Sequence, residues 1–600
     1  MLRSCADGHD VSAKYANRLP ARPSLPDRQW PSNTLTKAPA CMAVDLRDGN
    51  QSLPNPMTFA QRVEMFKLLV EIGFKEIEVA FPCSCKTDYD FVRHLVETKG
   101  LVPDDVTLQV ITPCREDAIE TAIESLRGAK KGIVMTYMAS SDNLREVMLR
   151  LSEDEWVARA KRVTSYARFL IAQDTSGTQW TYNFGFEDFA NARPEAVLRC
   201  ADVVINEWDP SIERPMILGV AASVEVSTPN VFADQIEFFL RNVSRRSDFR
   251  LTVHTHNDRG GAVATAELAC LAGADRVEGC LFGNGERAGN MDTVVFGLNL
   301  LTSGVDPGLD FSNLNAIRKV YEDISKLPVH PRTPYSGDFY FRAFSGAHQD
   351  AITKGLKIRN AGSAGDVAGL PTWPAWRVPY LPCDPADVGR SLDCVVGINS
   401  QSGKGGVAWM LANGIGLDIP ADLAHSFSKI VKAKSDRANR SIGMKELCSD
   451  FISAHYMDTL SGIVTIQHRS NGDTQFGTEP LLAILGKSDE KPEIVLAESL
   501  SLPVPSVTIQ QQKLIGVSIP GRYAAYAKVK SEGWAEAVWG VGIGSGEKES
   551  AARAILSAFV AHGELVILSP ADVSNASPRT EKETLQTSVR SVPQMLDVHS

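Results

Sequence analysis

The amino-acid sequence predicts an α/β protein whose largest part is a (β/α)8 TIM barrel. Three observations support this prediction: eight short apolar runs, amphipathic stretches between them, and a spacing that fits all eight into roughly 250 residues. Strands that alternate with helices pair in parallel, and eight such units are the number that closes a barrel. An open, doubly wound sheet is the alternative that the same alternation allows.

Two hydrophobic periods locate the expected elements. Helices over 59–72 and 232–243 carry apolar residues at i, i+3, i+4 and i+7, and Pro229 and Asn230 mark the start of the second. The strands are expected at 42–46, 76–81, 106–111, 132–137, 179–184, 216–220, 251–256 and 276–282.

Composition divides the chain into five parts. Residues 1–39 and 567–600 lack periodicity and are predicted to be a disordered arm and a disordered tail. The barrel is expected over 40–327, and a helical linker region over 328–457 follows it, with helices at 421–433 and 445–456. A small α+β domain is expected over 458–566, with strands at 462–468, 524–529 and 537–541 and a helix at 548–562.

Charge and cysteine content narrow the class of protein. The net charge of −10 argues against a nucleic-acid partner, and no apolar run reaches the ~20 residues that would span a membrane. Eleven scattered cysteines are typical of reduced thiols in an intracellular protein. The N-terminal segment lacks the apolar core of a secretory signal, and Asp7 and Asp10 favour a cytoplasmic over a mitochondrial location.

Candidate metal ligands follow the first and seventh expected strands, at the end of the barrel where active sites lie. His254 and His256 are two residues apart, so their imidazoles point to the same face of a strand. Asp48 adds a carboxylate after the first strand. This mixed nitrogen and oxygen set suits a divalent cation such as Mg²⁺, Mn²⁺ or Zn²⁺, whereas two histidines alone would be ordinary polar residues.

A glycine-rich segment, 283–290, follows the eighth expected strand. Glycine lets a backbone approach a ligand closely, and the last loops of such barrels often bind phosphate-bearing groups. Gly283, Asn284, Gly285 and Glu286 are therefore candidates for binding a phosphate-bearing ligand. A tight turn that binds nothing is the other interpretation.

Six segments together resemble one known family. They read DLRDGNQSL, GFKEIEVAFP, TVHTHNDRGGAVATAELACLAGADRVEGCLFGNGERAGN, FSGAHQDAITKGL, WRVPYLPCDPADVGR and NSQSGKGG. They closely resemble 2-isopropylmalate synthase in its long fungal and actinobacterial form, continuously from about residue 40 to 455. The resemblance implies an acyltransferase that condenses acetyl-CoA with a 2-oxo acid to give a 2-substituted malate and CoA. Gly283, Asn284, Gly285 and Glu286 would then bind acetyl-CoA.

The resemblance also implies roles for particular residues. A metal would be held by Asp48, His254 and His256 with Asn290 nearby, and Arg47 would stabilise the developing oxyanion. Proton abstraction from the acetyl group is linked to His348, supported by Glu187 and Tyr380.

The linker subdomains at 328–457 cover the active site in related enzymes and reach the partner subunit, which implies a homodimer. Without the resemblance, His348 would be an exposed loop histidine and Tyr380 a core aromatic residue. The C-terminal domain resembles a leucine-sensing regulatory domain, but the chain departs from that pattern after Ile543, which argues against leucine feedback.

Departures from the family pattern gather where the side chain of the 2-oxo acid would bind. The family usually reads close to HFYNSTS after the fourth strand, where this chain has Met135 and Met138 for the histidine and asparagine. Gly185 replaces a serine, Ser223 replaces a threonine, and Gln51 completes the expected substrate-binding set. Because methionine adapts to irregular apolar pockets, we expect a bulkier or aromatic 2-oxo acid.

One such acid is 4-hydroxyphenylpyruvate, whose extension would lead to a homo-amino acid of specialised metabolism. The first alternative is an ordinary 2-isopropylmalate synthase of leucine biosynthesis that acts on 2-oxoisovalerate, and the second is a catalytically inactive regulatory paralogue. A homocitrate synthase, a citramalate synthase, a hydroxymethylglutaryl-CoA lyase and a metal-dependent barrel hydrolase are further alternatives. The intact set of Arg47, Asp48, His254, His256 and His348 argues against an inactive protein.

Overall fold

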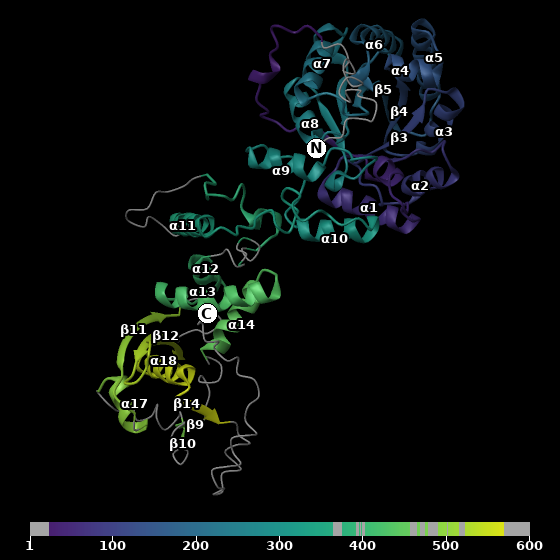
Figure 1. Cartoon of the computed structure of the whole chain (residues 1–600). Coiled ribbons are helices and arrows are strands. Elements are labelled where there is room, and N and C mark those ends of the chain that lie inside the picture. The colour runs from purple at the N-terminus through teal and green to yellow at the C-terminus, as the bar shows by residue number, and fades with distance from the viewer. Residues whose placement is uncertain are drawn as a thin grey trace, which may run out of the picture. The chain divides into compact units, whose positions relative to one another are not determined.

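The structure is a computed structural model that describes residues 23–363, 375–391, 403–455, 490–500, 502–514 and 523–568, with residues 395, 398, 465–468 and 475–477. The described residues form two compact units (Figure 1). The first runs to Phe341 and also contains Cys383–Ser391, and the second contains the other described residues from Arg342 onward. Residues 328–341 and 383–391 thus belong with the barrel, although the sequence pattern assigns them to the linker region.

Eight parallel strands close into a barrel in the first unit (Figure 1). They follow one another around the sheet in chain order, and the first strand pairs with both the second and the last. This order confirms the predicted (β/α)8 barrel and excludes the open sheet. The strands are β1 (Ala40–Ala43), β2 (Glu76–Ala80), β3 (Thr107–Pro113), β4 (Lys131–Ala139), β5 (Gln179–Glu187), β6 (Met216–Ala222), β7 (Arg250–Thr255) and β8 (Arg276–Gly279).

Helices that follow the strands along the chain cover the outside of the barrel (Figure 1). The first of them starts at a capping box in which Thr58 and Gln61 satisfy each other's backbone amides, and it ends at Gly73 with φ 111°. The helices are α1 (Phe59–Ile72), α2 (Lys86–Glu97), α3 (Glu116–Leu126), α4 (Asp142–Leu144), α5 (Glu153–Ala172), α6 (Pro194–Trp208), α7 (Pro229–Asn242), α8 (Ala262–Leu271), α9 (Thr293–Thr302) and α10 (Leu314–Ser325). None of the described helices combines the length and the apolar character that crossing a bilayer requires.

The first strand ends earlier than the sequence pattern predicts. A strand is expected over 42–46, but β1 ends at Ala43, and Asp45–Gly49 form a π-helical turn. The amides of Arg47 and Gly49 both donate to the carbonyl of Val44, at 3.2 and 3.1 Å. The turn therefore directs the polar residues that follow β1 out of the sheet.

Part of the arm that the sequence predicts to be disordered is ordered in the structure. Trp30 is buried, and its indole and the Arg28 guanidinium each donate to Asp234 at 2.8 Å. The Trp30 amide donates to Glu237 at 2.9 Å. Both carboxylates are buried on α7, so the arm is held by polar contacts that leave no hydrophobic period in the sequence.

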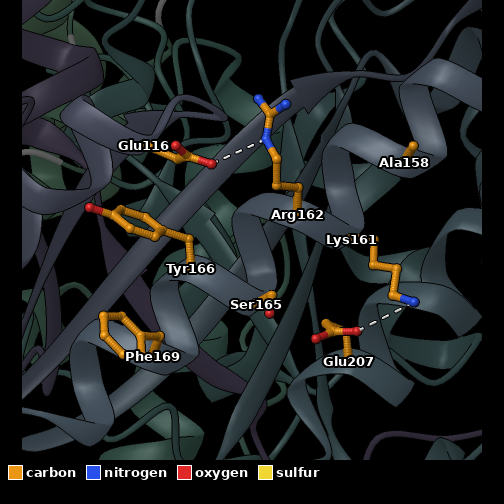
Figure 2. A pocket seen from close by; sticks show the side chains of 8 residues that line it. All are labelled: Glu116, Ala158, Lys161, Arg162, Ser165, Tyr166, Phe169 and Glu207. Carbon is orange, nitrogen blue, oxygen red and sulfur yellow. Dashed lines mark ion pairs between the residues drawn. The ribbon is translucent and has the colours of Figure 1, made fainter.

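An open hollow of about 550 Å³ lies on the outer helices of the first unit (Figure 2). Residues from α3, α5 and α6 line it, and its charged side chains already pair with one another: Arg162 with Glu116 at 3.1 Å, and Lys161 with Glu207 at 3.9 Å. None of its lining residues is a predicted site residue. The predicted metal ligands lie instead at the carboxyl ends of the barrel strands.

The second unit combines helices with two small antiparallel sheets, as expected for an α+β domain. Residues 462–464 of one expected strand lie outside the described residues. The helices are α11 (Gly346–Ser363), α12 (Lys404–Ile415), α13 (Ala421–Ala438), α14 (Met444–Ala454), α17 (Pro492–Leu500) and α18 (Glu547–His562). One sheet has the order β11 (Ser506–Lys513), β12 (Tyr523–Lys530), β13 (Val538–Gly544), and the other has the order β10 (Gln475–Gly477), β9 (Thr465–His468), β14 (Leu565–Leu568).

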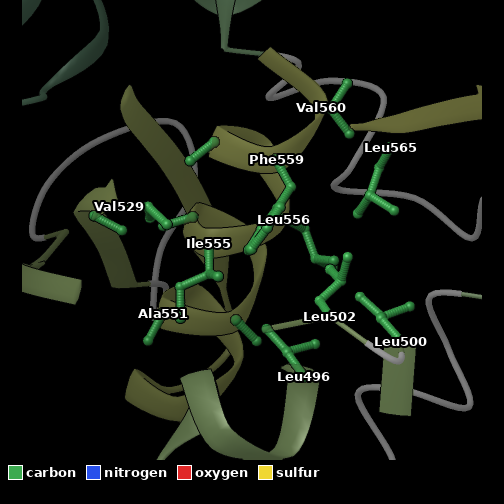
Figure 3. Close-up of a cluster of buried hydrophobic side chains, with 14 of the residues drawn as sticks. Leu496, Leu500, Leu502, Val529, Ala551, Ile555, Leu556, Phe559, Val560 and Leu565 are labelled. Carbon is green, nitrogen blue, oxygen red and sulfur yellow. The ribbon is translucent and has the colours of Figure 1, made fainter. Parts of the chain in front are cut away.

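A hydrophobic core joins α17 and α18 to the larger sheet (Figure 3). Ile555 and Phe559 of α18 lie in this core with Leu496 of α17 and Val529 of β12. Glycines bring α18 directly onto β13: a Cβ at Gly540 would lie only 2.0 Å from the carbonyl oxygen of Ala554. The helix can approach this closely only because that strand position has no side chain.

We predict that Gly540→Ala destabilises this domain by at least the roughly 1–3 kcal/mol typical of an overpacked core, because the obstacle is rigid backbone. Gly405→Ala in α12 is the matched control, since no atom lies within 4 Å of its added Cβ. Urea unfolding of both variants measures the difference. Equal midpoints for the two variants would contradict the prediction.

Candidate active site

Three potential metal ligands meet at the carboxyl ends of β1 and β7. The Nε2 atom of His254 lies 3.6 Å from Oδ2 of Asp48 and 3.2 Å from Nε2 of His256. Ligand atoms of all three residues lie within 4.8 Å of one another. The structure thus brings together the aspartate and the paired histidines that the sequence predicts.

These distances fit one divalent cation. Ions such as Zn²⁺ bind nitrogen and oxygen ligands at about 2.0–2.2 Å, so two ligand atoms on one ion lie roughly 3 Å apart. Asn290, the fourth predicted ligand, donates from Nδ2 to Asp48 at 2.7 Å. Its Oδ1 atom is buried and has no hydrogen-bond partner among the described residues, so an oxygen ligand adjoins the cluster.

Electrostatics in the cluster favours a bound cation. Burial alone would lower the pKa of His254, but hydrogen bonds to Asp48 and Glu278 raise it to about 10. Burial and the neighbouring His254 lower the pKa of His256 to about 3. Burial opposes the charged form of Asp48 as well, yet Arg47 and the two histidines hold its pKa well below the usual range. The ionised carboxylates therefore favour positive charge at this point.

Arg47 lies beside the cluster as a permanent cation. It donates from an NH1 group to Asp48 at 2.6 Å, and its Nε group contacts the fully buried Glu78. Burial works against its charge, but Glu78 and Asp48 raise its pKa. A fixed guanidinium at this place suits stabilisation of a developing oxyanion.

Glu187 lies at the end of β5, half-buried, with its pKa raised by burial and by the adjacent charge of Asp188. Burial and the charge of Glu187 also raise the pKa of Tyr137 on the neighbouring strand β4. A carboxyl group with a raised pKa at a strand end is suited to acid–base chemistry.

The glycine-rich loop folds onto the cluster. A Cβ at Gly285 would lie 2.7 Å from the side-chain nitrogen of Asn290, so this close approach requires glycine. Asn284 donates to a carbonyl of the turn after β1 at 2.9 Å, and Gln51 donates to Glu286 at 2.9 Å. The loop is therefore bonded to the β1 turn, and its binding of acetyl-CoA stays a prediction.

Two of the predicted pocket residues touch each other. A Cβ at Gly185 would lie 2.5 Å from the terminal methyl of Met135, so Met135 occupies the space that a side chain there would need. Gly185 pairs in register with Gly219 of β6, where an added Cβ would meet no atom closer than 3.4 Å. Two neighbouring positions on the inner wall of the barrel, on β5 and β6, therefore lack side chains. Gly219 was not predicted from the sequence, because only strand register places it beside Gly185.

Met138 and Ser223, two further residues predicted to bind the substrate, have different contacts from those of Met135 and Gly185. Thr136 bonds to Tyr182, which in turn contacts Thr164 of α5, so Thr136 and Met138 both face the surrounding helices. The prediction of Met138 as a pocket residue is therefore wrong: strand residues three apart face opposite sides, and Met135 faces inward. The Ser223 hydroxyl accepts a hydrogen bond from the backbone amide of Asp188 at 2.8 Å, and it thereby supports the loop that follows β5.

His348 and Tyr380 belong to the second unit. His348 is exposed on α11, and its ring stacks on Tyr380 with 4.0 Å between centroids and 24° between planes. Tyr380 is 62% exposed, which excludes the interpretation as a core residue. The structure thus brings these two predicted residues together.

Two buried glutamates near the cluster were not among the residues predicted from the sequence. Glu278 lies 3.1 Å from Nδ1 of His254, and Glu78 contacts Arg47. The signal was available, because a barrel strand covered on both faces is normally apolar throughout, and both glutamates fall inside predicted strands.

Comparisons with known proteins agree with this geometry. Residues 38–320 match the family described as HMGL-like, and residues 338–412 match the alpha-isopropylmalate synthase post-catalytic domain. The chain is 55% identical to isopropyl malate synthase AMT7 of Alternaria alternata, covering 93% of this chain and 94% of the relative. It is 50% identical to isopropyl malate synthase htyA of Aspergillus rugulosus, over 94% and 96%. It is 42% identical to 2-isopropylmalate synthase of Schizosaccharomyces pombe, over 89% and 93%.

We predict that Asp48→Asn weakens the binding of Mn²⁺ at least about tenfold, because it removes a charged ligand and keeps the side chain's size. Isothermal titration of chelator-treated protein measures the affinity. Asp117→Asn on the exposed surface of α3 is the control and leaves it unchanged. Equal affinities for wild type and Asp48→Asn would rule out this site.

Proposed function

The chain belongs to the isopropylmalate synthase family, an acetyl-CoA-dependent acyltransferase family, and from this premise we propose that it condenses acetyl-CoA with a 2-oxo acid of the arylpyruvate class. The observation that carries the choice of acid is the wall beside the metal cluster. There, Gly185 and Gly219 lack side chains, and the flexible Met135 lies across the first of them. 4-Hydroxyphenylpyruvate is the acid we expect.

The proposed chemistry assigns roles to the predicted site residues. Asp48, His254, His256 and Asn290 would hold a divalent cation, which would supply Lewis-acid chemistry at the keto group. Arg47 stabilises the charge that develops on the keto oxygen as the new carbon–carbon bond forms. His348, with Glu187 and Tyr380, takes a proton from the acetyl methyl, the carbanion attacks the keto carbon, and water then cleaves the thioester to release CoA.

The contact between Met135 and Gly185 supports a preference for a 2-oxo acid other than 2-oxoisovalerate. A serine at Gly185, as the family pattern has, would require the terminal methyl of Met135 to move, so the two positions are coupled. Methionine conforms to the shape of a bulky apolar group more readily than a hydrogen-bonding histidine does.

We predict that the wild type uses 4-hydroxyphenylpyruvate or phenylpyruvate with a higher kcat/KM than 2-oxoisovalerate. The double variant Met135→His/Gly185→Ser shifts the ratio of the two kcat/KM values toward 2-oxoisovalerate by about tenfold or more. This is the discrimination that one or two methylene groups in a pocket typically produce. Thiol release from acetyl-CoA measures both.

Met138→Leu is the matched control, because Met138 faces the helices, and it leaves the ratio unchanged. If 2-oxoisovalerate were the best substrate of the wild type, an ordinary 2-isopropylmalate synthase would be the better interpretation.

The enzyme works as a homodimer in our proposal, with His348 and Tyr380 of one chain completing the barrel site of the other. Co-expression of Asp48→Asn and His348→Ala chains tests this. In mixed dimers one barrel has an intact Asp48 and receives an intact His348, so we expect about a quarter of wild-type activity from random pairing. Each variant alone is inactive. No activity from the mixture would mean that each chain supplies its own histidine.

A further inference from the structure

A buried arginine lies beneath the metal cluster. Arg276, the first residue of β8, is 0% exposed. Its Nε group donates to Thr252 at 2.9 Å, and its two terminal nitrogens reach Glu278 at 2.9 Å, Gln109 at 3.3 Å and Glu76. A single guanidinium therefore bonds to side chains from β2, β3, β7 and β8 across the inside of the barrel.

One chain of contacts leads from Arg276 to a predicted metal ligand. One oxygen of Glu278 accepts from Arg276, and its other oxygen lies 3.1 Å from Nδ1 of His254. With its Nδ1 atom facing a carboxylate, His254 donates there and presents Nε2 to the cluster.

A second chain of contacts leads to another ligand by a different route. The carbonyl oxygen of Gln109 faces Arg276, and its amide nitrogen donates to Glu78 at 2.6 Å. Glu78 in turn contacts Arg47, which donates to Asp48 at 2.6 Å. Gln109 thus accepts a bond on one side and donates one on the other, as its place between an arginine and a glutamate requires.

The two chains of contacts meet at the cluster, where His254 lies 3.6 Å from Asp48. We propose that Arg276 is a positioning residue that sets the orientation of both ligands, through Glu278 on one side and through Gln109, Glu78 and Arg47 on the other. The inference rests on the metal site proposed above.

A purely structural role does not account for this choice of residues. The inside of such a barrel is normally filled by branched apolar side chains, and buried ion pairs are often no more stable than apolar residues of the same size. A buried network of this kind is useful where it fixes geometry, and partners of metal-bound histidines commonly change metal affinity 10- to 100-fold.

The test compares metal affinity with stability in variants of the full chain. Arg276→Met removes the cation that pairs with Glu278 inside the barrel, and it is expected to lower both metal affinity and stability. In Arg276→Met/Glu278→Gln the charge of Glu278 is removed as well, so the unfolding midpoint of the metal-free protein recovers relative to the single variant. We expect the Mn²⁺ dissociation constant of the double variant to stay about 10- to 100-fold above that of the wild type.

Arg250→Met is the matched control. Arg250 also pairs with Glu76, at 2.8 Å, but it is 43% exposed and makes none of the contacts to Glu278 or Gln109. Its removal is expected to leave Mn²⁺ affinity unchanged. Glu278→Gln alone repeats the test at the other end of the contact and is expected to weaken Mn²⁺ binding to a similar degree.

Two results would overturn the inference: wild-type Mn²⁺ affinity in the double variant, or an equal loss in Arg250→Met. A wild-type protein that binds no divalent metal would instead refute the proposed function, so the two failures are distinguishable.

Discussion

Closure of the parallel sheet is the constraint on which the candidate site depends. In a closed barrel the carboxyl ends of all eight strands lie at one end, so residues more than 200 positions apart in the chain become neighbours. Asp48 follows β1 and the two histidines end β7, yet their ligand atoms lie within 4.8 Å of one another. The π-helical turn after β1 and the bonded glycine loop after β8 then fix the aspartate at this end.

Much of this arrangement follows from the sequence. It was possible to predict the eight strands and their order, the aspartate and the paired histidines. The sequence alone contains the hydrophobic periods of two and 3.6 residues and the positions of residues at strand ends. Gly219 could not be predicted, since its importance depends on register with Gly185 in the next strand. The error at Met138 was avoidable, because alternation along a strand places it opposite Met135.

The ordered arm and the early end of β1 escaped prediction for a different reason. Both depend on single polar contacts, such as the indole of Trp30 on Asp234 or the amide of Leu281 on Asp45. Such contacts join residues more than 200 positions apart and leave no periodic pattern. The same holds for Arg276, whose partners come from four strands, and this explains why the polar interior of the barrel becomes apparent only in three dimensions.

The docked arm limits how the chain can be shortened. Asp234 receives bonds from Arg28 and Trp30, and Glu237 receives bonds from the backbone of Gln29 and Trp30. An engineered truncation downstream of Trp30 would remove all of these donors from two carboxylates that are buried on α7 in the intact chain. Trimming upstream of Leu25, which is itself buried, would leave this anchorage intact.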